Sequence, residues 1–163
     1  MKNLQTYPDH IERLDILHMG LGIDDAGTFT KGGTNMEADS MAAKHIYELG
    51  LSKFRVVGPH TTINDVIRVN SESKPYQKLE SSSEENHRLL LQHLIEYNLR
   101  RDIWPALHDP LTTSVALGEK FVDFQDVNIE FNDEGAYRIG DGVKVRVSKG
   151  DISHPEEFMN LVE

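Results

Sequence analysis

A histidine and an aspartate stand side by side in the stretch WPALHDPL, which covers residues 104–111 and leads into a segment with helical spacing. Aspartate and proline at a helix start are typical of capping, because the carboxylate accepts a bond from a free backbone N–H and proline has no N–H to leave unpaired. Asp109 is also suited to a hard cation such as Ca²⁺, which prefers oxygen ligands. The neighbouring imidazole of His108 titrates near neutral pH and is suited to donate a proton to a leaving group.

Other side chains suggest two further kinds of metal site. Asp24 and Asp25 lie in a glycine-rich stretch, where loop carboxylates are either solvated or bind a cation. His18 and His60 are expected after strands, on the same layer of loops as His108, and three imidazoles near one cleft can hold a transition metal. Histidines at strand ends also bind backbone groups, so the sequence leaves both roles open.

The composition narrows the class of protein. The chain of 163 residues carries 27 acidic and 17 basic side chains, and its formal charge of -10 disfavours binding to the backbone of a nucleic acid. It has no cysteine, so a disulfide framework and a thiolate zinc site are excluded. The first residues lack the apolar core of a signal peptide, and no stretch approaches the roughly 20 apolar residues of a membrane span. We therefore expect a cytoplasmic protein with neither nucleic acid nor membrane as a partner.

The elements that must position these residues begin with a predicted βαβ unit. A short apolar run over 14–19 and another over 53–57 are typical of buried strands, and a helix is expected from Glu37 to Leu49 between them. The loop over 20–34 contains five glycines. Two strands joined by a helical crossover are parallel, and ligands gather beyond the carboxyl ends of such strands. The fold class expected is α/β.

The rest of the chain predicts helices and then hairpins. A short helix is expected over 64–69, a mobile polar loop over 70–83, a long helix over 84–100 capped by Ser83, and a short helix over 111–117. Runs over 127–131, 137–139 and 143–147 are separated by turn residues and predict an antiparallel appendage. Pro155 opens a terminal helix. The whole chain, 1–163, is expected to form one domain.

Several segments resemble one known family, the inosine-uridine preferring nucleoside hydrolases. LHDPLTTSVAL is similar to the family's His-Asp motif at a helix start, and RLDILHMGLG is similar to a strand that ends in Met-Gly-Gly. GTNMEADSMAAKHIYELGL resembles its Glu-Phe-Asn segment and following helix, KFRVVGPHTT resembles the next strand, and residues 127–163 resemble the terminal hairpins and last helix. The order is that of the family's C-terminal half. The resemblance implies an open, mostly parallel sheet flanked by helices, with an antiparallel hairpin region near the C-terminus.

The resemblance also implies roles for individual residues. Asp109 matches a metal-coordinating aspartate, His108 matches the histidine that faces the leaving base, and Asn35 matches an asparagine that binds the ribose. Gly33 stands where the family has a glutamate, and Gly27 stands where it has a further asparagine, so part of the ribose site is altered. Asn35 follows two glycines, and asparagine in that setting is also a common turn residue.

The implied activity is Ca²⁺-dependent hydrolysis of the N-glycosidic bond of ribonucleosides. In the family, an Asp-x-Asp-Pro-Gly-x-Asp-Asp motif supplies most of the Ca²⁺ ligands. This motif is not in the sequence, and only GIDDA at 22–26 resembles its end. One hypothesis is a hydrolase component completed by an N-terminal-half polypeptide or by a second copy in a homo-oligomer. The other is an inactive relative that binds a nucleoside-like small molecule or serves in assembly. In either case a half sheet exposes an edge, so association is expected.

Overall fold

The computed structural model describes residues 13–23 and 27–162, which divide into two compact units. The first unit joins the described chain up to Thr61 with Val122–Asp151, and the second joins Thr62–Phe121 with the chain from Ile152 onward. The first unit holds the larger cluster of buried apolar side chains, and the second buries residues such as Ile67, Leu111 and Phe158. The division into compact units does not test the prediction that the chain forms one domain, which therefore stays a prediction.

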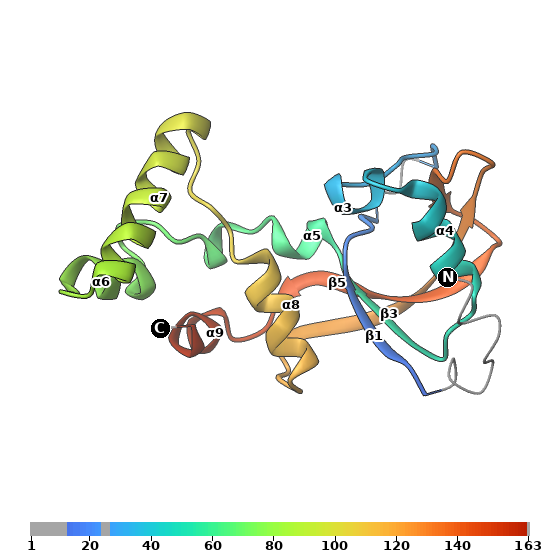
Figure 1. The fold of residues 1–163 in the computed structure, drawn as a ribbon. Helices are drawn as coiled ribbons and strands as arrows, with labels where there is room; N and C mark the ends of the chain where they lie inside the picture. The colour runs from blue at the N-terminus through green and yellow to red at the C-terminus, as the bar shows by residue number, and fades with distance from the viewer. Residues whose placement is uncertain (1–12, 24–26, 163) are drawn as a thin grey trace. The chain divides into compact units, whose positions relative to one another are not determined.

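The first unit is built on a five-stranded sheet with the order β1-β2-β5-β3-β4. β1 runs parallel to β2, which places Ile16 opposite Phe54, and β2 runs parallel to β5, which places Val56 opposite Val147. β3 and β4 are antiparallel. The predicted open, mostly parallel sheet is therefore confirmed (Figure 1). The strands are β1 (Asp15–Met19), β2 (Lys53–Val57), β3 (Val122–Phe131), β4 (Tyr137–Ile139) and β5 (Val143–Ile152).

A βαβ unit connects the first two strands, as predicted. The expected helix over 37–49 is α4 (Ser40–Glu48), which a short helix, α3 (Thr34–Glu37), precedes. The two are separate because Asp39 leaves the helical conformation and caps α4 by accepting the N–H of Ala42 at 2.9 Å. Helix α4 covers one face of the sheet (Figure 1). Its Tyr47 is buried against Phe54, whose ring centroid lies 4.7 Å away in an edge-on arrangement.

The last strands differ from the prediction in their connection. The hairpin of β3 and β4 is confirmed, with Ile129 opposite Ile139. β5 was expected in the same antiparallel appendage, but it pairs in parallel with β2 and so lies inside the sheet. The physical reason is burial, because Val145 and Val147 of β5 enter the core beside β2. The antiparallel hairpin region near the C-terminus is therefore confirmed, but it is part of the same sheet, because β5 lies between β2 and β3.

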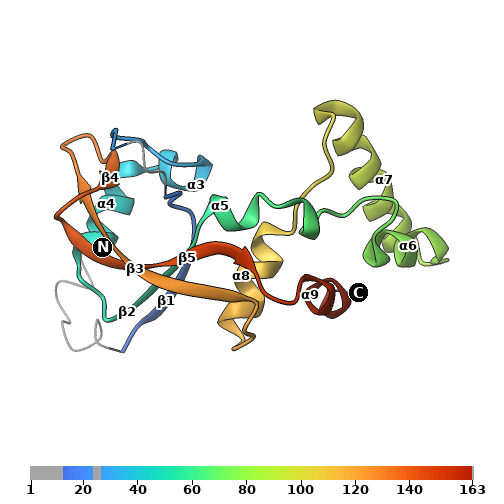
Figure 2. The same ribbon diagram turned by 180° about the vertical axis from the view of Figure 1, so that it is seen from behind.

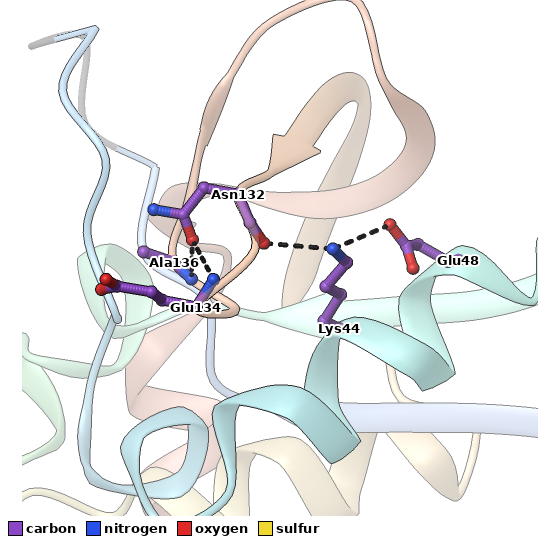
Figure 3. Close-up of polar contacts among 5 residues, drawn as sticks. All are labelled: Lys44, Glu48, Asn132, Glu134 and Ala136. Carbon is purple, nitrogen blue, oxygen red and sulfur yellow. Dashed lines mark hydrogen bonds and ion pairs between the residues drawn. The ribbon is translucent and has the colours of Figure 1, made fainter.

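Polar contacts fasten the turn between β3 and β4 to helix α4 (Figure 3). The side-chain oxygen of Asn132 accepts the backbone N–H groups of Glu134 and Ala136 at 3.0 and 2.9 Å. The Lys44 ammonium donates to the carbonyl oxygen of Asn132 at 3.1 Å and lies 3.8 Å from the Glu48 carboxylate. The side chain of Asn132 therefore stabilises the turn from within, and Lys44 binds the turn to α4.

Replacing Asn132 by alanine is expected to destabilise the first unit by about 1–3 kcal/mol, because two backbone donors lose their acceptor. The Asn132→Ala variant should lower the midpoint of urea unfolding. The control is Asp133→Ala, since Asp133 is exposed on the same turn. Equal midpoints for the two variants would contradict the proposed role of the side-chain oxygen of Asn132.

The second unit is helical and contains several short helices and one longer helix, α7 (Glu85–Arg101), beside which α6 (Lys74–Ser81) packs (Figure 2). A helix, α6, occupies most of the segment that was expected to be a mobile loop, so that expectation is wrong. Pro75 lies in its first turn, and Tyr76 is buried edge-on against Trp104 with centroids 5.6 Å apart. The helices that follow β2 are α5 (Pro59–Thr62), the 3-10 turn η1 (Asp65–Ile67), α6 (Lys74–Ser81), α7 (Glu85–Arg101), α8 (His108–Ala116) and α9 (Pro155–Leu161).

Helices α7 and α9 agree with the prediction in place, and only the cap of α7 differs in detail. α7 is capped at Glu84 and not at Ser83, and the hydroxyl of Ser82 accepts the N–H of Glu84 at 3.2 Å. α9 begins at Pro155 after His154, which takes a left-handed conformation. Within the described part of the chain, no helix combines the length and the apolar character that crossing a bilayer requires.

Candidate functional site

The carboxyl ends of β1, β2 and β5 lie along one edge of the sheet, where α/β proteins usually bind their ligands. Asn35, in the second position of α3, lies at the end of β1 and donates its amide to the carbonyl oxygen of Met19 at 3.0 Å. Gly33 caps this helix, so Asn35 occupies a helical position and not a turn. Its side chain is exposed at the edge where a ligand would lie.

Gly33 and Gly27, where the resemblance implies a glutamate and an asparagine, both have open space at the position of a Cβ atom. A Cβ atom on Gly33 would meet nothing within 4 Å, and the backbone φ of -91° suits any residue. Gly27 has a φ of +63°, which favours glycine and which asparagine also tolerates, and its Cβ would likewise meet nothing within 4 Å. The altered part of the expected ribose site is therefore sterically open.

His60 joins the glycine-rich loop to β5. Its Nε2 lies 2.7 Å from the carbonyl oxygen of Ser148, so Nε2 carries the hydrogen, and its Nδ1 accepts the N–H of Ile23 at 3.4 Å. The buried hydroxyl of Ser148 accepts the N–H of Gly58 at 3.0 Å and the hydroxyl of Thr61 at 2.7 Å. Thr61 and Ser148 were not predicted, because a buried pair of hydroxyl groups leaves no local pattern in the sequence.

His18 is bound inside the first unit. Its Nδ1 lies 2.8 Å from the hydroxyl of Tyr47. Burial lowers the pKa of His18 and, together with the nearby Tyr137, raises the pKa of Tyr47, so at neutral pH both side chains are uncharged. Since His18 and His60 both have partners within the chain, the alternative of satisfied strand-end histidines fits the structure better than a cluster of three imidazoles. No group of three or more His, Cys, Asp or Glu residues suited to a metal ion is present among residues 13–23 and 27–162.

His108 is the first residue of α8, in the second unit. The chain before it forms a short antiparallel bridge in which Leu107 donates to the carbonyl oxygen of Ile67 at 3.0 Å, and Val69 donates to that of Pro105 at 3.0 Å. Arg68 of the bridge donates to the carbonyl oxygen of Trp104 at 2.5 Å. The start of α8 is therefore fixed by main-chain pairing and not by a side-chain cap.

The environment of His108 keeps its imidazole neutral. Burial is the main cause that lowers its pKa, the guanidinium of Arg68 lowers it further, and the carboxylate of Asp109 opposes them. Its Nδ1 is buried, and no partner within the described residues bonds to it. A buried polar atom without a partner is uncommon and is typical of sites that bind a ligand or water.

Asp109 does not cap α8, because the cap residue is Leu107 and Asp109 follows within the first turn. The capping interpretation is therefore wrong in its position, although a carboxylate in the first turn still interacts favourably with the helix dipole. The side chain is exposed. Ca²⁺ takes six to eight oxygen ligands, and Asp109 provides one without further carboxylates gathered around it in the described residues. These residues alone do not fit a Ca²⁺ site.

The expected site residues fall in both units of the chain. Asn35 belongs to the first unit, and His108 and Asp109 belong to the second. Asp24 and Asp25, which were considered as metal ligands, lie outside the described residues.

The pKa shifts of His18 and His108 predict that the protein is less stable in mild acid. Both imidazoles resist protonation when folded, and in the unfolded chain they titrate near the ordinary value of 6.5, so unfolding takes up protons. The contribution of these two imidazoles to the free energy of unfolding is fully present above pH 6.5, and it is lost as the pH drops below that value. Urea unfolding between about pH 7.5 and 5 should show this loss, and His18→Gln should reduce it. The exposed His93→Gln variant serves as the control.

No protein-family model matches the sequence, and no curated protein matches it. Solved structures, by contrast, match the structure of the chain. The inosine-uridine preferring nucleoside hydrolase from Bacillus anthracis superposes with a TM-score of 0.68 at 16% identity, over 99% of this chain and 54% of its own. The purine-preferring ribonucleoside hydrolase from Gardnerella vaginalis gives 0.65 at 19% identity, over 98% of this chain and 55% of its own.

The fold is that of the nucleoside hydrolases. The chain spans about half the length of these two hydrolases. The fold implied by the sequence resemblance is thereby confirmed. The two nucleoside hydrolases share fewer than one residue in five with this chain, so the comparison establishes the architecture, and the activity must be argued from individual residues.

Proposed function

We propose that this chain is a component of a nucleoside hydrolase, which acts on the N-glycosidic bond of ribonucleosides when another polypeptide supplies the missing carboxylates. The observation that carries the proposal is the neutral His108 at the start of α8, with Asp109 beside it and with a buried ring nitrogen that no residue in the described part of the chain bonds. A neutral imidazole can donate its N–H to a departing base. Asn35, whose amide nitrogen is bound to Met19, keeps its side-chain oxygen for a sugar hydroxyl.

In such an enzyme the metal ion would supply an activated water, and most of its ligands would come from the other polypeptide, with Asp109 as one contribution. In the second unit, His108 would stabilise the base as it acquires negative charge. No role in providing the nucleophile falls to a described residue of this chain.

The first test is the release of ribose from a mixture of inosine, uridine and cytidine, with and without Ca²⁺. When a polypeptide that supplies the missing carboxylates is added to the chain, we expect Ca²⁺-dependent release, and His108→Ala should lower the rate by about 10²–10⁴-fold, as loss of a general acid does. Asp109→Ala should abolish the dependence on Ca²⁺. The control is Glu119→Ala, which replaces an exposed carboxylate in the same unit.

A second candidate function is nucleoside binding without catalysis, and the glycines at 27 and 33 favour it. It predicts heat of binding in calorimetry with inosine but no release of ribose. Because a Cβ on Gly33 meets open space, Gly33→Glu should fold normally and tighten binding, whereas Asn35→Ala should weaken it. An absence of both heat and ribose release would argue against both functions for the isolated chain.

A further inference from the structure

Three hydrogen bonds among the described residues hold the turn after β1 to the rest of the first unit. Gly20 donates its N–H to a carbonyl oxygen of β2 at 3.1 Å, and the carbonyl oxygen of Gly22 accepts the hydroxyl of Tyr137 at 3.0 Å. Ile23 donates its N–H to Nδ1 of His60 at 3.4 Å. Between about pH 5 and 8 an imidazole changes its protonation, whereas a carbonyl oxygen and a tyrosine hydroxyl do not. The bond to His60 is therefore the one of the three that responds to pH.

The ring of His60 is fixed by Ser148 on β5. Its Nε2 lies 2.7 Å from the carbonyl oxygen of Ser148 and 3.4 Å from the hydroxyl oxygen of the same residue. Because a carbonyl oxygen only accepts hydrogen bonds, Nε2 carries the hydrogen of the neutral ring, and Nδ1 has the lone pair that binds Ile23. Gly58 leaves space for the ring, since a Cβ atom there would lie 2.5 Å from Nδ1 and 2.7 Å from the carbonyl oxygen of Leu21. The ring therefore connects β5 to the turn.

Protonation of His60 affects the two bonds of its ring unequally. In the imidazolium both nitrogens carry a hydrogen. Nε2 continues to donate to Ser148, but the hydrogen on Nδ1 faces the N–H of Ile23, and two donors have no acceptor between them. A flip of the ring does not restore the bond, because the other nitrogen also carries a hydrogen. The bond to β5 therefore survives protonation, and the bond to Ile23 is lost.

The backbone just before Ile23 is strained. Leu21 has a φ of +44°, a left-handed conformation that is uncommon for leucine, and its side chain is 0% exposed. Such conformations persist only where the surrounding contacts impose them. The bond between Ile23 and His60 is one of these contacts, two residues further along the chain. Loss of this bond therefore leaves a strained turn with one restraint fewer, which favours its release.

No charged side chain in the described part of the chain binds His60, whose hydrogen bonds go to Ser148 and Ile23. The titratable or charged residues on the neighbouring segments are His18, Asp24, Asp25, Lys149 and Asp151. Lys149 and Asp151 are exposed, and His18 is bound to Tyr47. The two aspartates of the turn lie outside the described residues, and carboxylates ordinarily titrate near about pH 4, below the range of histidine. His18 is therefore the group from which His60 must be distinguished by experiment.

We propose that His60 is a pH-sensitive switch: its neutral imidazole holds the turn after β1 against β5, and its protonation in mildly acidic solution releases the turn at Ile23. The residues that form the switch all belong to the first unit. The turn leads from the carboxyl end of β1 toward α3, so the switch acts at the edge of the sheet where Asn35 lies. It requires neither a ligand nor a metal ion.

The first experiment measures amide hydrogen exchange of the full chain by NMR at about pH 7.5 and 5.5, on the two sides of the ordinary titration of histidine. Each rate is divided into the rate of an unstructured peptide at the same pH, which gives a protection factor. We expect the protection factor of Ile23 to fall at least about fivefold at the lower pH, because its N–H loses its acceptor. Thr30 is the internal control, since its N–H binds the carbonyl oxygen of Tyr137 at 2.8 Å and should stay protected.

The second experiment identifies the titrating group with two variants. In His60→Asn, the side-chain oxygen replaces Nδ1 as an acceptor and takes up no proton, so the protection factor of Ile23 should be the same at both pH values. The matched control is His18→Gln, which removes the other imidazole at this edge of the sheet. It should leave the fall in the protection factor of Ile23 unchanged.

A protection factor of Ile23 that is equal at both pH values in the unaltered chain overturns the proposal. Equal losses at Ile23 and Thr30 overturn it too, because they show a general loss of stability and not the release of one contact. A fall at Ile23 that persists in His60→Asn, or that His18→Gln abolishes, assigns the titration to another group and also overturns it. The unaltered chain decides the first two outcomes even if His60→Asn fails to fold. Neither nucleoside nor Ca²⁺ is present, so the result is independent of the proposed hydrolase function.

Discussion

Replacing Gly142 by alanine is expected to cost the first unit about 3–5 kcal/mol, because there is no room for even one methyl group at this position. A Cβ atom on Gly142 would lie 2.1 Å from the carbonyl oxygen of Ile129 and 2.8 Å from the Cα of Glu130. Both are backbone atoms of β3, so they cannot turn aside as a flexible side chain would. Because Ile129 is 1% exposed, a shift of β3 at this point disturbs the core.

The matched control is Gly22→Ala, where a Cβ would make ordinary contacts of 3.7 and 3.8 Å with Pro59. This variant should change the free energy of unfolding by no more than about 0.5 kcal/mol. Urea unfolding followed by circular dichroism would measure both variants. Equal stabilities of Gly142→Ala and Gly22→Ala would contradict the close contact between β3 and the turn that precedes β5.

Replacing Phe158 by alanine is expected to cost the second unit about 3–5 kcal/mol. Phe158 is 0% exposed, and its ring packs edge-on against Phe121 with centroids 5.6 Å apart. It is the only side chain of α9 that is fully buried, and the chain before the helix is held where Ser153 donates to the carbonyl oxygen of Phe121 at 2.7 Å. Loss of the ring would leave a cavity at the centre of these contacts.

Leu161→Ala is the control on the same helix, since Leu161 is 54% exposed and its removal leaves no cavity. Its expected effect is within about 0.5 kcal/mol. Equal unfolding midpoints for Phe158→Ala and Leu161→Ala would contradict the packing of α9 described above.

The same two core variants test whether the chain is one domain. The expectation of a single domain predicts one unfolding transition, which Gly142→Ala and Phe158→Ala both shift. Two transitions, of which each variant moved only one, would show instead that the two compact units unfold independently. Calorimetry of the two variants and of the unaltered chain distinguishes these outcomes.

Local patterns in the sequence were enough to predict the elements that depend on neighbouring residues. The strands at 15–19 and 53–57 and the long helix over 85–101 follow from their apolar spacing, and the hairpin of β3 and β4 follows from its turn residues. The placement of His108 and Asp109 near a helix start was predicted as well. These features depend on interactions between residues close in the chain, which a sequence pattern records directly.

Only the tertiary structure decided which strands meet and which polar atoms are buried. β5 lies between β2 and β3 because Val145 and Val147 are buried in the core there, and no local pattern names the partner of a strand. α6 forms in a polar segment because Pro75 and Tyr76 are buried, with Tyr76 against Trp104. The unpaired nitrogen of His108 likewise depends on residues about 40 positions earlier, since Arg68 and its neighbours pair with the chain before α8. Contacts between segments far apart in the sequence add burial energy that local propensity does not contain, and they therefore determine the candidate site.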